Sequence, residues 1–137
     1  MLYFRLFISL LFSINLYAVD LAVIVSKDSN INNISKKELS KIFLAKTKRL
    51  PSGDRAIPVE NTNKVYQSKF YKIVSNKNEK QLKKYWAKMI FTGRGQPPKK
   101  INSINEVIAF IQNNKNAISY IPFDYVNNDL KIIMEIK

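Results

Sequence analysis

LAVIV, residues 21–25, is the stretch that decides the fold class. The run is too short for a helix, is rich in β-branched residues and contains no polar residue that could face solvent. It therefore predicts a strand that is buried on both faces, and such strands are typical of sheets that contain parallel pairing. The rest of the chain should supply helices that cover the faces of this sheet.

Four helices are predicted downstream of this strand. The first, at about residues 35–45, begins with Ser35 and Glu38 at the spacing of a capping box, and the last, to about residue 113, begins with a second such pair, Ser103 and Glu106. The other two run from about residue 63 to 74 and from the N-cap Asn78 to about residue 90. The apolar residues expected to face the core are Leu39, Ile42, Phe43, Tyr66, Phe70, Ile73, Val74, Leu82, Tyr85, Trp86, Met89, Ile90, Ile104, Val107, Ile108 and Ile111.

Three further strands are predicted, at residues 56–59, 117–121 and 130–136. Pro58 places the first of them at a sheet edge. Gly93 is expected to end the third helix, and the two prolines that follow should prevent it from restarting. Strands and helices thus alternate without a repeat or linker, which predicts an α/β domain with a mixed sheet flanked by helices.

The composition favours an anionic partner and argues against an enzyme. The 137 residues include 23 Lys and Arg against 10 Asp and Glu, a formal charge of +13, and contain no cysteine and no histidine. Thiol nucleophiles, disulfides, histidine bases and the usual zinc ligand sets are therefore excluded. The acidic residues are scattered and form no close pair. We expect no catalytic residue, no metal and no cofactor.

Residues 1–18 have the layout of a secretory signal peptide. Arg5 precedes an apolar run from Leu6 to Ile14, and Ala18 supplies the small residue before a cleavage site. A transmembrane anchor is the alternative, but the run is shorter than the roughly 20 residues that span a bilayer. We therefore expect a periplasmic domain of residues 19–137 with no integral membrane segment after cleavage. Export also argues against nucleic acid as a partner. A basic nucleic-acid-binding protein remains a further interpretation, and it requires that residues 1–18 are not a signal peptide.

Two strand ends are candidate anion sites, because ligands of α/β sheets collect where strands end and helix N-termini begin. Asn61, Thr62 and Asn63 follow the strand at 56–59, where their side chains and nearby backbone N–H groups could seat an oxyanion. The same residue types are ordinary helix caps, and this alternative stays open. Ser26 follows the first strand, and it could donate to a ligand or be only a polar loop residue.

The loop GRGQ, residues 93–96, carries a third candidate. The guanidinium of Arg94 could form a bidentate contact with an anion or an acidic partner. A solvated turn is the alternative.

Three segments together resemble a known family. They are ISKKELSKIFLAKTKRLPSGDRAIPV at residues 34–59, LKKYWAKMIFTGRGQPPK at 82–99 and AISYIP at 117–122. In this order they resemble the phosphate ABC-transporter substrate-binding proteins, and more closely the small single-lobe periplasmic-binding-protein-like domains related to them. The resemblance implies one lobe of a type II periplasmic-binding-protein-like fold. Where full-length members carry an Arg and a Ser-Gly-Thr turn, this sequence reads ENTNKVYQSKF, with Thr62 as the nearest hydroxyl.

The resemblance also implies a function. We expect an exported, non-enzymatic solute-binding protein that binds phosphate or another oxyanion for uptake or sensing, through Asn61, Thr62 and Asn63, with Ser26 and Arg94 at the rim. A membrane transporter or a sensor protein would be its partner. The alternative is an interaction module without a small ligand, which docks on an envelope sensor or transporter through its basic face.

Overall fold

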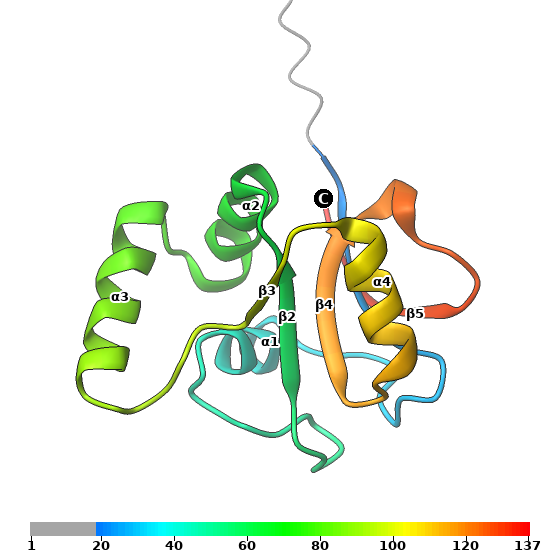
Figure 1. Ribbon diagram of the computed structural model, residues 1–137, viewed down its shortest axis with the longest axis horizontal. Coiled ribbons are helices and arrows are strands. Elements are labelled where there is room, and N and C mark those ends of the chain that lie inside the picture. Colours follow the sequence, from blue (N-terminus) through cyan, green and yellow to red (C-terminus); the bar gives the residue numbers. More distant parts are fainter. Residues whose placement is uncertain (1–18) are drawn as a thin grey trace, which may run out of the picture.

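The structure is a computed structural model that describes residues 19–137, so the predicted signal peptide lies outside the described residues. The chain forms a mixed sheet flanked by helices, as predicted (Figure 1). The strands are β1 (Leu21–Ser26), β2 (Ile57–Asn61), β3 (Lys99–Ile101), β4 (Ala117–Pro122) and β5 (Leu130–Ile136). The helices are α1 (Lys36–Phe43), α2 (Lys64–Ser75), α3 (Glu79–Phe91) and α4 (Ile104–Asn113), with a 3-10 turn at Phe123–Tyr125.

The five strands lie in the order β3-β2-β4-β1-β5. β2 pairs in parallel with both β3 and β4, which confirms that the sheet contains parallel strands. The LAVIV strand itself pairs antiparallel with β4 and with β5. Its apolar run therefore reflects its central position, with all six residues buried, and does not reflect parallel neighbours.

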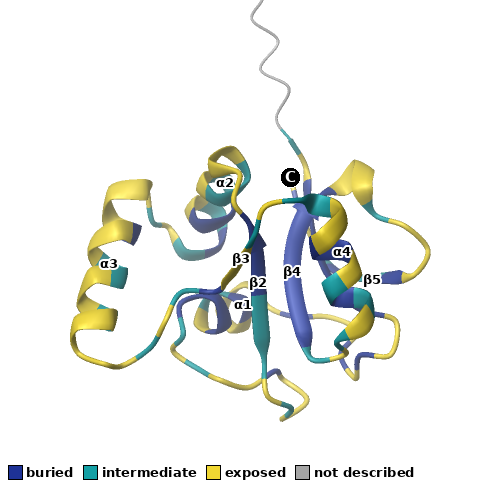
Figure 2. Cartoon of the chain, in the orientation of Figure 1, coloured by how far each residue is buried: buried dark blue, intermediate teal, exposed yellow. Residues whose placement is uncertain are grey.

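The two faces of the sheet carry separate hydrophobic cores. Figure 2 shows the buried residues gathered along the central strands and on parts of the helices beside them. Alternate residues of β1 point to opposite faces, so that Val23 packs toward α1 and α2, whereas Ile24 packs toward α4. The first core contains an aromatic cluster in which the rings of Phe70 and Tyr120 stack with a centroid distance of 3.9 Å. Phe43 meets Phe70 edge-on at 4.8 Å. This cluster holds α1 and α2 against the sheet.

The helix starts follow the sequence closely. Ser35 and Glu38 form both hydrogen bonds of the predicted capping box. Ser103 accepts a hydrogen bond from the Glu106 N–H at 3.4 Å, but the Glu106 side chain does not return the bond, so the second box is only half formed. Gly93 ends α3 with a positive φ of 65°, as expected. None of the helices in residues 19–137 has the length and apolarity needed to cross a bilayer.

Two predictions along residues 78–101 need correction. The stripe of α3 faces the core only in part: Leu82 is buried, Tyr85 and Trp86 are half-buried and pack against the first core, and Ile90 is 57% exposed. The reason is that α3 lies beyond α1 and α2 at the edge of the molecule and does not pack on the sheet (Figure 1). In addition, residues 99–101 form the edge strand β3, where only a loop was expected.

Pro58 lies where β2 lacks one neighbour. Its pairing with β4 is opposite Ile118, whereas the pairing of β2 with β3 begins one residue later, at Val59. The missing N–H of proline is therefore tolerated in a strand that is otherwise interior. The prediction of an edge strand is wrong, because β2 lies between β3 and β4, and only the start of the strand lacks a second neighbour.

Candidate functional site

The carboxyl ends of β2, β3 and β4 meet at one edge of the sheet, which we call the carboxyl edge. The chain leaves β2 through α2 and α3 to reach β3, and then returns through α4 to β4 on the other side of β2. Crossovers between parallel strands are right-handed, so two crossovers that run in opposite directions place their helices on opposite faces. α2 and α4 lie on opposite faces, as this rule requires. Both helices begin at the carboxyl edge, which makes it a topological switch point.

Asn61 joins the ends of β2 and β3. Its side-chain Nδ2 donates to the carbonyl oxygens of Ile101, at 3.1 Å, and Asn102, at 2.9 Å. Its Oδ1 accepts the N–H of Asn63 at 3.0 Å. Only 5% of the Asn61 surface is exposed, and both polar atoms of its side chain are already hydrogen-bonded. Asn61 therefore fixes the shape of the carboxyl edge and is poorly placed to contact a ligand.

Asn63 is the N-cap of α2. Its Oδ1 accepts the N–H groups of Val65, at 2.9 Å, and Tyr66, at 3.4 Å. The capping role that the sequence left open for this residue is therefore present in the structure.

Thr62 is exposed between these two asparagines, and its N–H donates to the Ile101 carbonyl at 3.3 Å. Within residues 19–137, neither the Thr62 hydroxyl nor the N–H of Lys64 has a hydrogen-bond partner. These two groups are the donors that the start of α2 presents to solvent.

Glu60 carries a buried charge next to this edge. The residue is 1% exposed, and its carboxylate accepts hydrogen bonds from the hydroxyls of Tyr120, at 2.7 Å, and Tyr71, at 3.1 Å. Gln67 donates to the other oxygen at 3.2 Å, and Lys100 forms an ion pair with it. Burial first, and then the Glu60 charge, raise the pKa of both tyrosines well above the ordinary value. Four partners from α2, β3 and β4 thus hold the carboxylate in place.

The sequence interpretation missed this network, since its members are far apart along the chain. The only local signal is the spacing of Gln67 and Tyr71, which places both side chains on one face of α2.

Ser26 and Arg94 do not lie at the carboxyl edge. Because β1 runs antiparallel to β4, Ser26 at its end lies where β2 and β4 begin. The Ser26 hydroxyl is buried and accepts the N–H of Asp28 at 3.2 Å. Arg94 lies beside the start of β2, in a groove with Lys48 and Arg55. Of the five predicted site residues, the structure brings together Asn61, Thr62 and Asn63 only.

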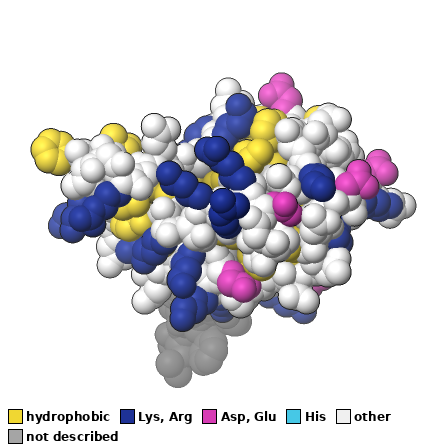
Figure 3. Space-filling model, turned by 90° about the horizontal axis from the view of Figure 1, so that it is seen from below, with side chains coloured by type: hydrophobic (Ala, Val, Ile, Leu, Met, Phe, Trp, Pro, Cys, Tyr) yellow, Lys and Arg dark blue, Asp and Glu magenta, His cyan; other side chains and the backbone are white. Residues whose placement is uncertain are grey.

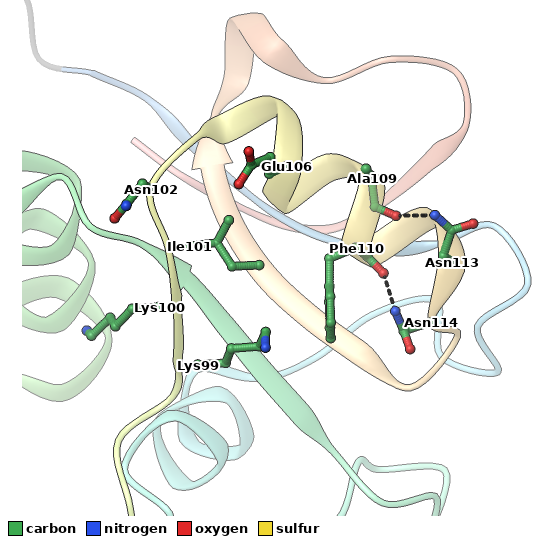
Figure 4. A pocket seen from close by; sticks show the side chains of 9 residues that line it. All are labelled: Lys99, Lys100, Ile101, Asn102, Glu106, Ala109, Phe110, Asn113 and Asn114. Carbon is green, nitrogen blue, oxygen red and sulfur yellow. Dashed lines mark hydrogen bonds between the residues drawn. The ribbon is translucent and has the colours of Figure 1, made fainter.

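A shallow hollow of about 560 Å³ runs between β3 and α4 (Figure 4). The ammonium group of Lys99 lies 5.4 Å from the centre of the Phe110 ring, while Lys100 points the other way, toward Glu60. The amides of Asn113 and Asn114 donate to carbonyls of their own helix, each at 2.8 Å. These two amides are therefore engaged with the backbone of α4. No group of three potential metal ligands occurs within residues 19–137.

Comparisons with known proteins place the fold. No family model and no curated protein matches the chain. Among solved structures, a protein from Clostridium perfringens assigned as a phosphate ABC transporter substrate-binding protein, with bound phosphate, superimposes with a TM-score of 0.65 and 17% identity, covering 84% of this chain and 45% of its own. An ABC-type phosphate transport receptor from Vibrio cholerae superimposes with a TM-score of 0.65 and 13% identity, over 85% of this chain and 46% of the receptor. PstS from Borrelia burgdorferi superimposes with a TM-score of 0.59 and 19% identity, over 84% of this chain and 47% of PstS.

The chain therefore spans about half the length of these structures. At such low identity the likeness concerns the fold alone. Residues 19–137 have the fold of a single lobe of the type II periplasmic-binding-protein-like class, the fold found in phosphate ABC transporter substrate-binding proteins.

Proposed function

We propose that residues 19–137 are an exported solute-binding protein that holds phosphate or another oxyanion at the carboxyl edge. One observation carries this proposal: the N-termini of α2 and α4 converge there from opposite faces of the sheet. The partial positive charges of both helix starts favour an anion at this place. The fold that the chain shares with a structure containing bound phosphate supports an oxyanion as the ligand.

Thr62 and the backbone of Lys64 are the proposed ligand contacts. Their O–H and N–H groups have no partner within residues 19–137, whereas Asn61 and Asn63 are engaged in holding the edge together. Asn61 and Asn63 thus act as positioning residues. Ser26 and Arg94, at the other end of the sheet, have no part in this site.

The affinity should be low. The chain offers one lobe, about half the length of the solved phosphate-binding proteins. Three hydrogen bonds to an anion, from Thr62, Lys64 and the first turn of α4, at roughly 1.5 kcal/mol each, correspond to a dissociation constant of about 1 mM. Tighter binding requires a second wall, from a second copy or from a membrane transporter or sensor.

Calorimetry tests the ligand. Residues 19–137 contain both hydrophobic cores and can be titrated with phosphate and with sulfate. Thr62→Val keeps the side-chain shape and removes the hydroxyl, so it should weaken binding about tenfold. Thr92→Val, an exposed threonine at the end of α3, is the matched control and should leave binding unchanged. Absence of heat with millimolar oxyanion would contradict the proposal.

Export has its own test. Protein purified from cell envelopes should begin at Val19, because Ala18 is the last residue of the proposed signal peptide. Recovery of the chain in the cytoplasm with Met1 still present would contradict export.

A further inference from the structure

A second hollow, which we call the basic groove, lies at the opposite end of the sheet from the carboxyl edge. It has a volume of about 600 Å³, within the range of ligand-binding clefts. Three segments line it: the turn after α1 with Lys48, the start of β2 with Arg55, and the loop between α3 and β3 with Arg94. The groove therefore brings together cationic residues that are far apart in the sequence.

The cationic residues of the groove have no acidic partner in the described part of the chain. Within residues 19–137, no Asp or Glu lines the groove, and the ion pairs involve other residues, Lys69 with Asp20 and Lys100 with Glu60. Figure 3 shows basic side chains spread over the face of the molecule seen from below, where β2 begins, with hydrophobic surface between them. Such a groove attracts a partner with several negative charges.

The walls of the groove are preformed. A Cβ on Gly95 would lie 2.9 Å from the Ala45 Cβ, so the loop packs directly on the turn after α1. The Tyr85 hydroxyl donates to the Leu44 carbonyl at 2.5 Å and ties α3 to the same turn. The adjacent pair of prolines stiffens the loop further. A partner therefore meets a rigid surface, which lowers the entropy cost of binding.

The lining also indicates which kind of anion fits. Ile57, Ile90 and Pro97 provide apolar walls between the cations, which suits a chain that carries both acidic and apolar side chains. Among residues 19–137, no aromatic side chain lines the groove, so this part of the chain offers none of the stacking platforms that single-stranded nucleic acids use. A hollow admits an extended chain, whereas a flat bilayer surface would stay at its rim. A second copy would bring the same positive charge.

We propose that the basic groove is the docking site for an extended, acidic segment of a partner protein. Carboxylates of that segment pair with Lys48, Arg55 and Arg94, and its apolar side chains pack on Ile90 and Pro97. This docking does not depend on the oxyanion site, which lies at the other end of β2.

Fluorescence anisotropy with a labelled peptide tests the proposal. The probe is a peptide of about ten residues, long enough to cross the groove in extended form, in which Glu and Asp alternate with Leu. Its partner probe carries Gln and Asn in place of the acids. Residues 19–137 should bind the acidic peptide, and rising salt should weaken the binding. The neutral peptide should not bind.

Charge reversals locate the peptide. Arg94→Glu and Arg55→Glu should each weaken binding about tenfold or more, since each removes an attraction and adds a repulsion inside the groove. Lys36→Glu changes the net charge equally at an exposed position in the first turn of α1, where an acidic residue is favourable, and should change binding less than about twofold. Equal weakening by Lys36→Glu would show a general charge effect and overturn the proposal.

Three other outcomes also overturn it. One is equal binding of the neutral peptide. Another is binding of phosphatidylserine vesicles that Arg94→Glu abolishes while the peptide does not bind, which would make this face a membrane surface. The last is a millimolar phosphate titration that shifts the backbone amides of Arg94 and Gly95, which would make the groove a small-anion site. Loss of phosphate binding in Thr62→Val bears on the oxyanion proposal alone.

Discussion

Replacement of Glu60 by leucine removes the carboxylate that four partners hold beside the carboxyl edge. The change leaves the hydroxyls of Tyr71 and Tyr120 buried without an acceptor. Gln67 is half-buried and the side chain of Lys100 is 40% exposed, so both can turn to water. The expected loss of stability therefore comes chiefly from the two tyrosines.

The magnitude follows from these two orphaned groups. A buried hydroxyl without a partner costs about 1–3 kcal/mol, so the pair costs about 2–6 kcal/mol. Leucine returns roughly 1.5–3 kcal/mol through its buried apolar surface. We expect Glu60→Leu to lower the free energy of unfolding by about 2 kcal/mol.

The triple variant Glu60→Leu, Tyr71→Phe, Tyr120→Phe removes the orphaned hydroxyls as well. Replacing a whole buried polar network by apolar groups of similar shape can be nearly neutral, so the triple variant should recover most of the loss. Urea unfolding of the parent, the single and the triple variant at neutral pH measures the three free energies. If the single variant is as stable as the parent, or if the tyrosine changes lower stability further, the carboxylate does not hold the two hydroxyls.

Two further predictions concern the packing of the basic groove and the buried tyrosines. Gly95→Ala forces a Cβ to within 2.9 Å of the Ala45 Cβ, so it should lower the free energy of unfolding by about 1–3 kcal/mol in a urea titration, and an unchanged midpoint would show that the loop is not packed on the turn after α1. The pKa values of Tyr71 and Tyr120 are raised in the folded state, so their contribution to stability is complete below the ordinary value of 10.0 and is lost as the pH rises above it. Unfolding midpoints followed into alkali should fall for the parent and fall less for a double variant, Tyr71→Phe with Tyr120→Phe, and parallel curves would refute the assignment.

Much of the fold could be predicted because its signals are local. The capping box of α1 needs only Ser35 and Glu38, three residues apart, and both of its hydrogen bonds are present. Gly93 ends α3 for an equally local reason, its positive φ. By contrast, the direction in which β1 pairs depends on strands about a hundred residues away, and its apolar run is the same for either direction. The three residues of β3 are too few for a pattern.

The depth to which an element is buried is also not a local property. The stripe on α3 has helical periodicity, but its members are buried to different depths: Leu82 is buried, Tyr85 and Trp86 are half-buried against the first core, and Ile90 is 57% exposed. Periodicity identifies an apolar face and says nothing of how far the neighbouring elements extend.

Only part of the candidate site could be found from the sequence. The sequence could predict one group of site residues, Asn61, Thr62 and Asn63, because strand, turn and helix follow one another there. Ser26 was grouped with them on the rule that ligands collect at strand ends, but β1 runs in the opposite direction, so its end lies at the far side of the sheet. The Glu60 network could not be predicted from the sequence, since its donor Tyr120 is 60 residues away in the chain.

The proposed oxyanion site at the carboxyl edge is tested most directly by backbone amide chemical shifts. Isotope-labelled residues 19–137 are titrated with phosphate, and the shift of each amide is followed by nuclear magnetic resonance. We expect the largest changes at Thr62, at Lys64 and in the first turn of α4 from Ile104, where the two helix starts converge. No change up to millimolar phosphate, or changes centred on Arg94 and the basic groove, would contradict an oxyanion site at the carboxyl edge.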